Sequence, residues 1–250
     1  MLCYTVRMNA GRTARERVRA ELIREITEIA RRQLATDGAA GLSLRAVARE
    51  MGMVSSAIYR YFPSRDDLLT TLIIDGYNAV GAAVEKAEAA CPPEDYADRW
   101  LAGCRAVRDW ALAHPHEYAL VYGSPVPGYQ APERTIGPAS RAAAAFARII
   151  GDAYRAGASG VLRPTPEHAS LTPPGPPVPE CFAPDAARIR ETILAGVPDE
   201  IVAGALIAWS GLFGLVSFEL FGQFENVVTD RAAFFDHAAA RLGQLTGLPA

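Results

Sequence analysis

A short stretch of the chain joins three spacing constraints to a set of polar side chains. Ala48 is small, Gly52 follows four residues later, and Ile58 comes six residues after the glycine. This spacing is typical of two helices that nearly touch at a steep angle around a tight turn, with an apolar residue of the second helix filling their contact. It predicts a helix-turn-helix, whose second helix fits the major groove of DNA.

The second helix, predicted from Val54 to Tyr61, has one side free for binding. Ile58 and Phe62 are expected to pack in the interior, so four side chains of the helix can face outward: Ser55, Ser56, Tyr59 and Arg60. Short hydroxyls and an aromatic hydroxyl suit base edges and phosphates in a groove about 12 Å wide. The alternative is an ordinary helical hairpin whose outer residues bind nothing.

Charge is distributed unevenly along the 250 residues. Residues 1–65 hold 12 Lys and Arg against 6 Asp and Glu, a net charge of +6, whereas the whole chain carries -3. A basic head on an acidic body predicts a polyanionic partner for the head alone. The alternative is a solvated helix whose arginines pair along its own surface, as Arg17 with Glu21 and Arg24 with Glu28 would allow. Spacing and charge together favour DNA.

The hydrophobic period is helical nearly everywhere, and no alternating run demands a sheet, so the predicted class is all-α. A long first helix should end near Gly38 and Gly41, and its apolar stripe is Val18, Leu22, Ile26, Ile29 and Ala30. Ser64 and Asp67 have the spacing of a capping box that begins a long helix to about Ala89.

Further helices are expected over residues 95–113, 132–156, 198–224 and 230–245, with a short one after His114. Eight prolines in residues 158–184 predict a mobile loop without regular helix. We therefore expect a DNA-binding domain over residues 12–74, in three helices ahead of a long connecting helix, and a larger helical domain over 75–250.

The segment from Arg15 to Leu69 resembles the DNA-binding domain of the TetR (tetracycline-repressor-like) family of bacterial transcriptional regulators. The resemblance rests on the long first helix, the turn at Gly52 and the run IYRYFPSRDDLL over residues 58–69. Relatives usually show Leu-Tyr-x-His-Phe and then a Lys, where this chain has Ile58, Tyr61 and Arg65. The resemblance implies that Tyr61 and Arg65 contact phosphates. The complete predicted DNA-binding set is Ser43, Arg45, Ser55, Ser56, Tyr59, Arg60, Tyr61, Ser64 and Arg65.

The segments HPHEYALVYGSPVPGY and AWSGLFGLVSFELFGQF resemble a C-terminal domain of an actinobacterial branch of this family. The resemblance implies that the domain over residues 75–250 serves ligand binding and dimerisation, with a small-molecule effector and a dimer formed by the last two helices. Five aromatic residues are the candidate effector site, although each also suits an ordinary core: Trp110, Tyr118, Tyr122, Trp209 and Phe213. Because interior charges are few, the effector should be apolar or aromatic, unless Arg141 and Arg148 turn inward.

The 18 uncharged residues from Ile201 to Phe218 are just long enough to span a membrane. Their flanks are acidic and lack Lys and Arg, which favours a buried helix packed in its own domain and against a second chain. This helix contains three glycines, Gly204, Gly211 and Gly214. They are predicted to let a second chain pack closely against the helix and so to serve dimerisation.

No nucleophile motif, phosphate loop or dinucleotide fingerprint is present, so an enzyme is not expected and a hydrolase ranks last. The four cysteines are scattered, so no disulfide is predicted. His114 and His116 lack acidic or Cys partners at ligand spacing, so no metal site is predicted, and no cofactor is expected. The start of the chain does not resemble a signal peptide, so a cytoplasmic location is expected. We predict a ligand-responsive DNA-binding regulator. The favoured interpretation is a repressor that binds a palindromic operator as a homodimer. The alternative is a helical small-molecule-binding protein without DNA binding.

Overall fold

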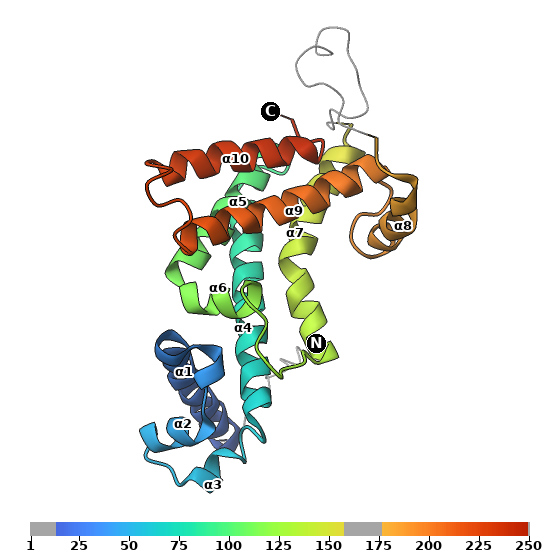
Figure 1. Ribbon diagram of the computed structural model, residues 1–250. Coiled ribbons are helices and arrows are strands. Elements are labelled where there is room, and N and C mark those ends of the chain that lie inside the picture. The colour runs from blue at the N-terminus through green and yellow to red at the C-terminus, as the bar shows by residue number, and fades with distance from the viewer. Residues whose placement is uncertain (1–13, 158–176, 250) are drawn as a thin grey trace, which may run out of the picture. The chain divides into compact units, whose positions relative to one another are not determined.

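The computed structural model describes residues 14–157 and 177–249. These parts hold ten α-helices and two short 3-10 helices but no strand, which confirms the all-α class (Figure 1). The first four helices are α1 (Ala14–Gly41), α2 (Leu44–Glu50), α3 (Ser55–Ile58) and α4 (Arg65–Glu88). The remaining six are α5 (Tyr96–Ala113), α6 (Pro115–Tyr122), α7 (Ile136–Arg155), α8 (Ala183–Thr192), α9 (Asp199–Leu220) and α10 (Arg231–Leu245).

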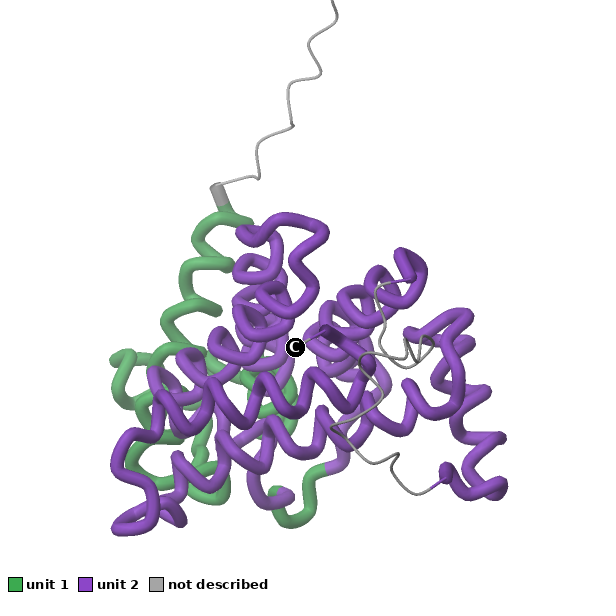
Figure 2. Tube along the Cα trace, turned by 90° about the horizontal axis from the view of Figure 1, so that it is seen from above, with its two compact units in different colours: residues 1–72, 126–129 green, residues 73–125, 130–250 purple. Residues whose placement is uncertain are grey.

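The chain divides into two compact units (Figure 2). The described part of the first unit, the head, is residues 14–72 with 126–129, and the second unit is residues 73–125 with 130 onward. The boundary lies inside α4, two residues before the one expected from sequence. Tyr129 belongs to the head because its hydroxyl lies 2.9 Å from the Thr70 hydroxyl.

The head is built around the buried side of α2. Val47, Ala48 and Ile58 are fully buried, and Ile26 and Ala30 of α1 are buried as the apolar stripe predicts. Val18 is a correction, because its side chain is 60% exposed. Residues 15–19 of α1 are all exposed, so the packed stripe starts only at Leu22. The end of α1 is bent at Gly38, whose φ of 66° is a conformation that favours glycine.

One core joins the helices of the second unit, in which α9 packs against α10, α5 and α8. Sequence reasoning missed α8, because the prolines were expected to prevent a helix as far as Pro184. That proline lies in the first turn of α8, where its missing N–H costs no hydrogen bond. Most of the predicted mobile loop, residues 158–176, lies outside the described residues.

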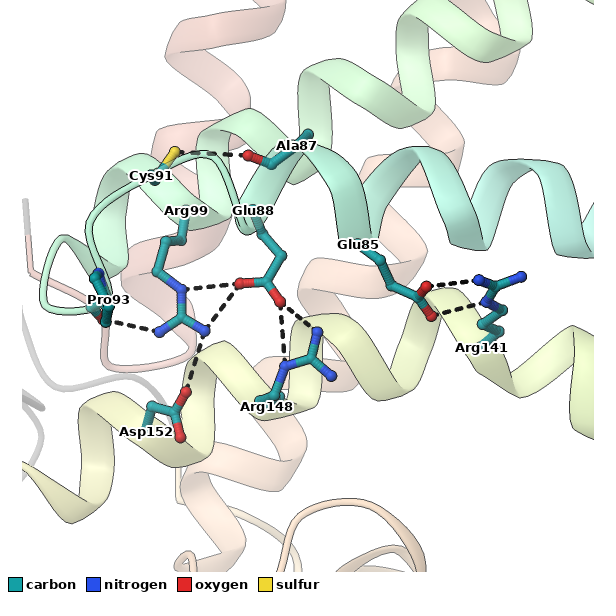
Figure 3. A network of polar contacts seen from close by, with 9 residues as sticks. All are labelled: Glu85, Ala87, Glu88, Cys91, Pro93, Arg99, Arg141, Arg148 and Asp152. Atoms are coloured by element: carbon teal, nitrogen blue, oxygen red, sulfur yellow. Dashed lines mark hydrogen bonds and ion pairs between the residues drawn. The ribbon is translucent and has the colours of Figure 1, made fainter. Parts of the chain in front are cut away.

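A buried ionic network ties α4 to α5 and α7 (Figure 3). Arg99 donates to Glu88 at 3.0 Å and to Asp152 at 3.1 Å, and the side chains of Arg99 and Glu88 are 7% and 6% exposed. Arg148 pairs with the same Glu88. One turn earlier in α4, Glu85 accepts two hydrogen bonds from Arg141, at 2.8 and 2.6 Å. Arg141 and Arg148, the two possible exceptions to an apolar effector site, are therefore both paired with carboxylates of α4.

Candidate nucleic-acid interface and effector domain

The turn between α2 and α3 has the geometry that the spacing predicts. Gly52 has a φ of 66°, and the Met53 N–H donates to the Ala48 carbonyl at 2.8 Å. Ala48 and Ile58 are both fully buried at the helix contact. The α-helix of α3 is shorter than predicted, since it ends at Ile58 rather than near Tyr61, and Val54 before it makes no side-chain hydrogen bond to its first turn. Helical turns nevertheless continue beyond it, since the Tyr61 and Phe62 N–H groups donate to the Ile58 carbonyl.

Six of the predicted DNA-binding side chains are exposed: Arg45, Ser55, Ser56, Tyr59, Arg60 and Ser64. Ser55 and Ser56 open α3, and Tyr59 follows its last residue with 43% of its surface exposed. Arg45 lies in the first turn of α2. Hydroxyls and guanidinium groups thus share the outer side of the helix-turn-helix, where they can donate to phosphates and base edges.

Two predicted residues use their hydroxyls inside the head. Ser43 caps α2, because its Oγ accepts from the Ala46 N–H, and its own N–H donates to Gln33 Oε1 at 3.2 Å. Ser64 caps α4 by accepting from the Asp67 N–H at 3.1 Å, and it donates to the Asp67 carboxylate at 2.7 Å. The capping box at Ser64 is confirmed. Gln33 was missed, and its only sequence signal is a polar side chain close to the apolar stripe of α1.

Arg65 also points into the head. Its Nη2 donates to the Ala39 carbonyl at 2.6 Å and its Nε donates to the Leu42 carbonyl at 3.2 Å. These carbonyls end α1 and lead into α2, so the guanidinium joins the start of α4 to that corner. Such a bond to a charged donor is strong and orients both partners. The Arg65 guanidinium, which the resemblance assigns to a DNA phosphate, is therefore mostly engaged in hydrogen bonds within the chain.

Arg19 of α1 braces the segment after α3, a contact that sequence reasoning did not identify. Its guanidinium lies 5.3 Å from the centre of the Tyr61 ring and donates to the Arg60 carbonyl at 3.4 Å. Tyr61 is only partly exposed. Five residues of the predicted set, Arg45, Ser55, Ser56, Tyr59 and Arg60, are thus exposed on the outside of the head. The side chains of Ser43, Tyr61, Ser64 and Arg65 contact other groups of the head, and of these four Ser64 is also exposed.

Four of the five predicted effector residues form an aromatic cluster in the second unit. Tyr122 lies with its ring centre 4.2 Å from that of Phe213 and 5.2 Å from that of Tyr118, and Trp209 lies 4.5 Å from Phe213. The Tyr118 hydroxyl lies 2.8 Å from Ser217 Oγ. The Tyr122 hydroxyl is buried and has no hydrogen-bond partner among the described residues, and its burial raises the pKa of Tyr122. Trp110 is separate and stacks on His114.

The three glycines of α9 differ in their surroundings. A Cβ on Gly204 would lie 1.9 Å from the Leu245 carbonyl oxygen, and one on Gly211 would lie 2.7 Å from the Leu242 side chain. Both glycines therefore permit the close approach of α10 in the same chain. Gly214 has open space where a Cβ would be. Of the three, only Gly214 is placed where a second chain can approach.

By length and composition α9 is the one helix of residues 14–157 and 177–249 that could cross a membrane. Its packing against α5, α8 and α10 buries 33% of its apolar window, so part of its apolar surface is left uncovered by this chain. No group of three or more His, Cys, Asp or Glu able to hold a metal is found among the residues that the structure describes.

The chain is similar to known regulators over both units. The family described as bacterial regulatory proteins, tetR family, matches residues 26–72, and the tetracyclin repressor-like C-terminal domain matches residues 100–242. HTH-type transcriptional regulators of Mycobacterium tuberculosis (Rv1816) and Mycobacterium bovis (Mb1846) are each 42% identical over 238 residues, covering 94% of both chains.

Solved structures agree with these matches. The regulatory protein SCO4313 is 35% identical, with a TM-score of 0.70 over 92% of this chain and 98% of its own. A tetR-family regulatory protein from Rhodococcus RHA1, at 17% identity and a TM-score of 0.59 over 91% of this chain and 98% of its own, shares the fold. The exposed helix-turn-helix and these relatives lead to one conclusion: the chain belongs to the TetR family and is a DNA-binding transcriptional regulator.

Proposed function

We propose that the protein is a homodimeric repressor, which binds a palindromic operator and releases it when a small apolar effector occupies the second unit. The observation that carries DNA recognition is the outward set Arg45, Ser55, Ser56, Tyr59 and Arg60 around a buried helix contact. Arg45 and Arg60 supply charge for phosphates, and the hydroxyls of α3 supply donors and acceptors for bases. We propose the cytoplasm as its location, where DNA is available.

A second copy of this chain is the proposed partner of the outer side of α9. One side of α9 carries Ile207, Gly214 and Phe218, which follow one another at spacings of seven and four residues. Phe221 comes three residues after Phe218 and directly follows the last residue of the helix. The three large side chains are 57%, 53% and 49% exposed. An apolar stripe left in water is favourably buried against an identical stripe, which generates a two-fold axis. Two heads related by that axis match two half-sites of a palindrome.

The effector is proposed to be neutral and mainly apolar. Arg141 and Arg148 are both paired with carboxylates of α4, so neither supplies a free charge to a ligand. A charged effector would leave a buried charge unpaired. The apolar and aromatic side chains of the second unit's core instead suit a neutral ligand.

A small-molecule-binding protein that no longer binds DNA is the alternative, and a gel shift distinguishes it from a repressor. The probe is the intergenic DNA upstream of the gene, and a shuffled duplex of the same composition is the control. A repressor retards the upstream DNA at lower protein concentration than the shuffled duplex, and the retardation weakens as salt rises. Equal weak binding to both duplexes would favour the alternative.

A further inference from the structure

A cavity of about 140 Å³ lies inside the second unit, between α5, α7, α8 and α9. Every lining side chain is apolar or aromatic, among them Trp100, Ala147, Ile189 and Trp209. The rings of Tyr118, Tyr122 and Phe213 do not line it, so the aromatic cluster and the cavity are different places that share only Trp209. We propose that this cavity, rather than the aromatic cluster, binds the effector, and that it accepts one neutral apolar molecule about as large as a single aromatic ring.

The chemistry of the lining selects against charge. The Trp100 indole N–H is already bonded to the Ala239 carbonyl at 2.9 Å. The Trp209 indole N–H is the remaining side-chain donor among the lining residues. Arg148, next to Ala147 in sequence, is paired with Glu88. A carboxylate or ammonium group placed here would lose its water without gaining a partner, whereas a hydrocarbon ring loses nothing.

The size of the cavity bounds the ligand. An apolar cavity of about 150 Å³ in another protein stays dry and takes up benzene. Sites for drug-sized ligands are larger, about 300–1,000 Å³. A single substituted ring or a short branched alkyl chain therefore matches the available space, whereas a multi-ring ligand exceeds it.

One wall of the cavity is held rigidly from behind. The rings of Trp100 and Phe146 meet edge to face with their centres 4.9 Å apart. A Cβ on Gly243 would lie 2.9 Å from the Trp100 ring, and one on Gly103 would lie 2.9 Å from the Phe146 ring. Helices α10 and α5 thus press directly against these two rings, which keeps them from moving away from the cavity.

The opposite wall depends on α8. This helix packs mainly on α9. An ion pair also joins Arg190 near its end to Asp199 in the first turn of α9. Ile193, which follows α8, and Leu206 of α9 both line the cavity while remaining 38% and 41% exposed. A small ligand can therefore reach the cavity from the surface between α8 and α9.

Calorimetric titration of the full-length protein with toluene tests the site. We expect toluene to bind once per chain, and benzoate, which has a similar ring and one charge, to bind at least ~100-fold more weakly. Ala147→Leu places a larger side chain in the cavity and should weaken toluene binding by at least ~10-fold. Ala143→Leu, one turn earlier in the same wall, repeats the test if the first variant does not fold.

Two control variants make the result specific. Ala144→Leu makes the same change at an exposed position of α7, and Tyr122→Leu alters the aromatic cluster, so both should bind toluene as the wild type does. The proposal is overturned if the cavity-filling variants bind toluene normally, if Tyr122→Leu alone abolishes binding, or if benzoate binds as well as toluene.

The regulatory meaning of the cavity rests on the proposed function, but its occupancy does not. Toluene titration without DNA tests the cavity, and operator binding without toluene tests the repressor, so the two proposals fail separately. A decrease in operator affinity on adding toluene, absent in Ala147→Leu, would support both together.

Discussion

Replacing Arg65 with alanine tests how the head is held together. In the structure its guanidinium bonds to the Ala39 and Leu42 carbonyls at 2.6 and 3.2 Å, where α1 leads into α2. The family resemblance instead implies that it contacts a phosphate. The two roles predict different results, because loss of a phosphate contact changes the salt dependence of DNA binding, whereas loss of an internal bond changes the stability of the head.

The magnitude follows from the two bonds. A hydrogen bond from a charged donor contributes about 1.5–3 kcal/mol. The Arg65 side chain is 33% exposed, so water can replace part of what is lost. We therefore expect Arg65→Ala to lower the free energy of unfolding of the head by about 2 kcal/mol. Arg65→Lys should recover less than half of this loss, because an ammonium group lacks the planar fork that reaches two carbonyls.

The assay combines urea unfolding with DNA affinity measured across a range of salt concentrations. For Arg65→Ala we expect reduced stability and an unchanged slope of log affinity against log salt. The matched variant is Arg45→Ala, at an exposed position of α2, which should keep its stability and flatten the slope by roughly one unit per head. Normal stability of Arg65→Ala together with a flattened slope would refute the internal role of Arg65.

Three further predictions concern the second unit. Gly214→Leu should weaken the dimer in analytical ultracentrifugation but leave the fold of the single chain intact, because a Cβ there meets open space. Gly211→Leu, whose side chain would meet Leu242 in the same chain, should instead cost about 1–3 kcal/mol of stability. A fully dimeric Gly214→Leu would contradict the proposed interface. Glu88→Ala leaves the buried Arg99 with fewer partners and should lower the free energy of unfolding in urea by about 3 kcal/mol. A loss of stability below about 1 kcal/mol would show that the network contributes little. The pKa of Asp236 is lowered chiefly by its hydrogen bond from Arg105, so its contribution to stability is present above the unfolded pKa of about 4 and is lost as the pH falls through the folded value. Asp236→Asn should therefore be less stable than wild type at neutral pH but not at pH ~2. An equal difference in stability at both pH values would contradict this assignment.

Much of the helix-turn-helix could be predicted because its constraints are local. The spacing of Ala48, Gly52 and Ile58 specifies the turn, and the capping box at Ser64 begins α4 as expected. Sequence could not show where the Arg65 guanidinium is directed, because its partners lie more than twenty residues earlier. A long basic side chain reaches a phosphate or a carbonyl equally well, and only the fold decides which is closer.

In the second unit the helices were easier to predict than their contacts. Four of the five predicted aromatic residues do form one cluster, yet the cavity lies mostly among aliphatic residues of α7, α8 and α9. The prolines before and at the start of α8 argued against a helix there, so sequence reasoning missed α8 and with it one wall of the cavity. The glycines of α9 correctly indicated close packing, but for Gly204 and Gly211 the neighbour is α10 of the same chain rather than a partner.

The most direct test of the central claim is the specificity of Tyr59→Ala. Tyr59 is exposed directly after α3, on the proposed recognition surface, and its ring takes no part in the core of the head. The ratio of affinities for the operator and a shuffled duplex is measured by fluorescence anisotropy at one salt concentration for wild type and variant. We predict that the ratio falls by ~5- to 150-fold, equivalent to the loss of about 1–3 kcal/mol for one base contact, while binding to the shuffled duplex hardly changes. An unchanged ratio would contradict recognition of DNA by this surface.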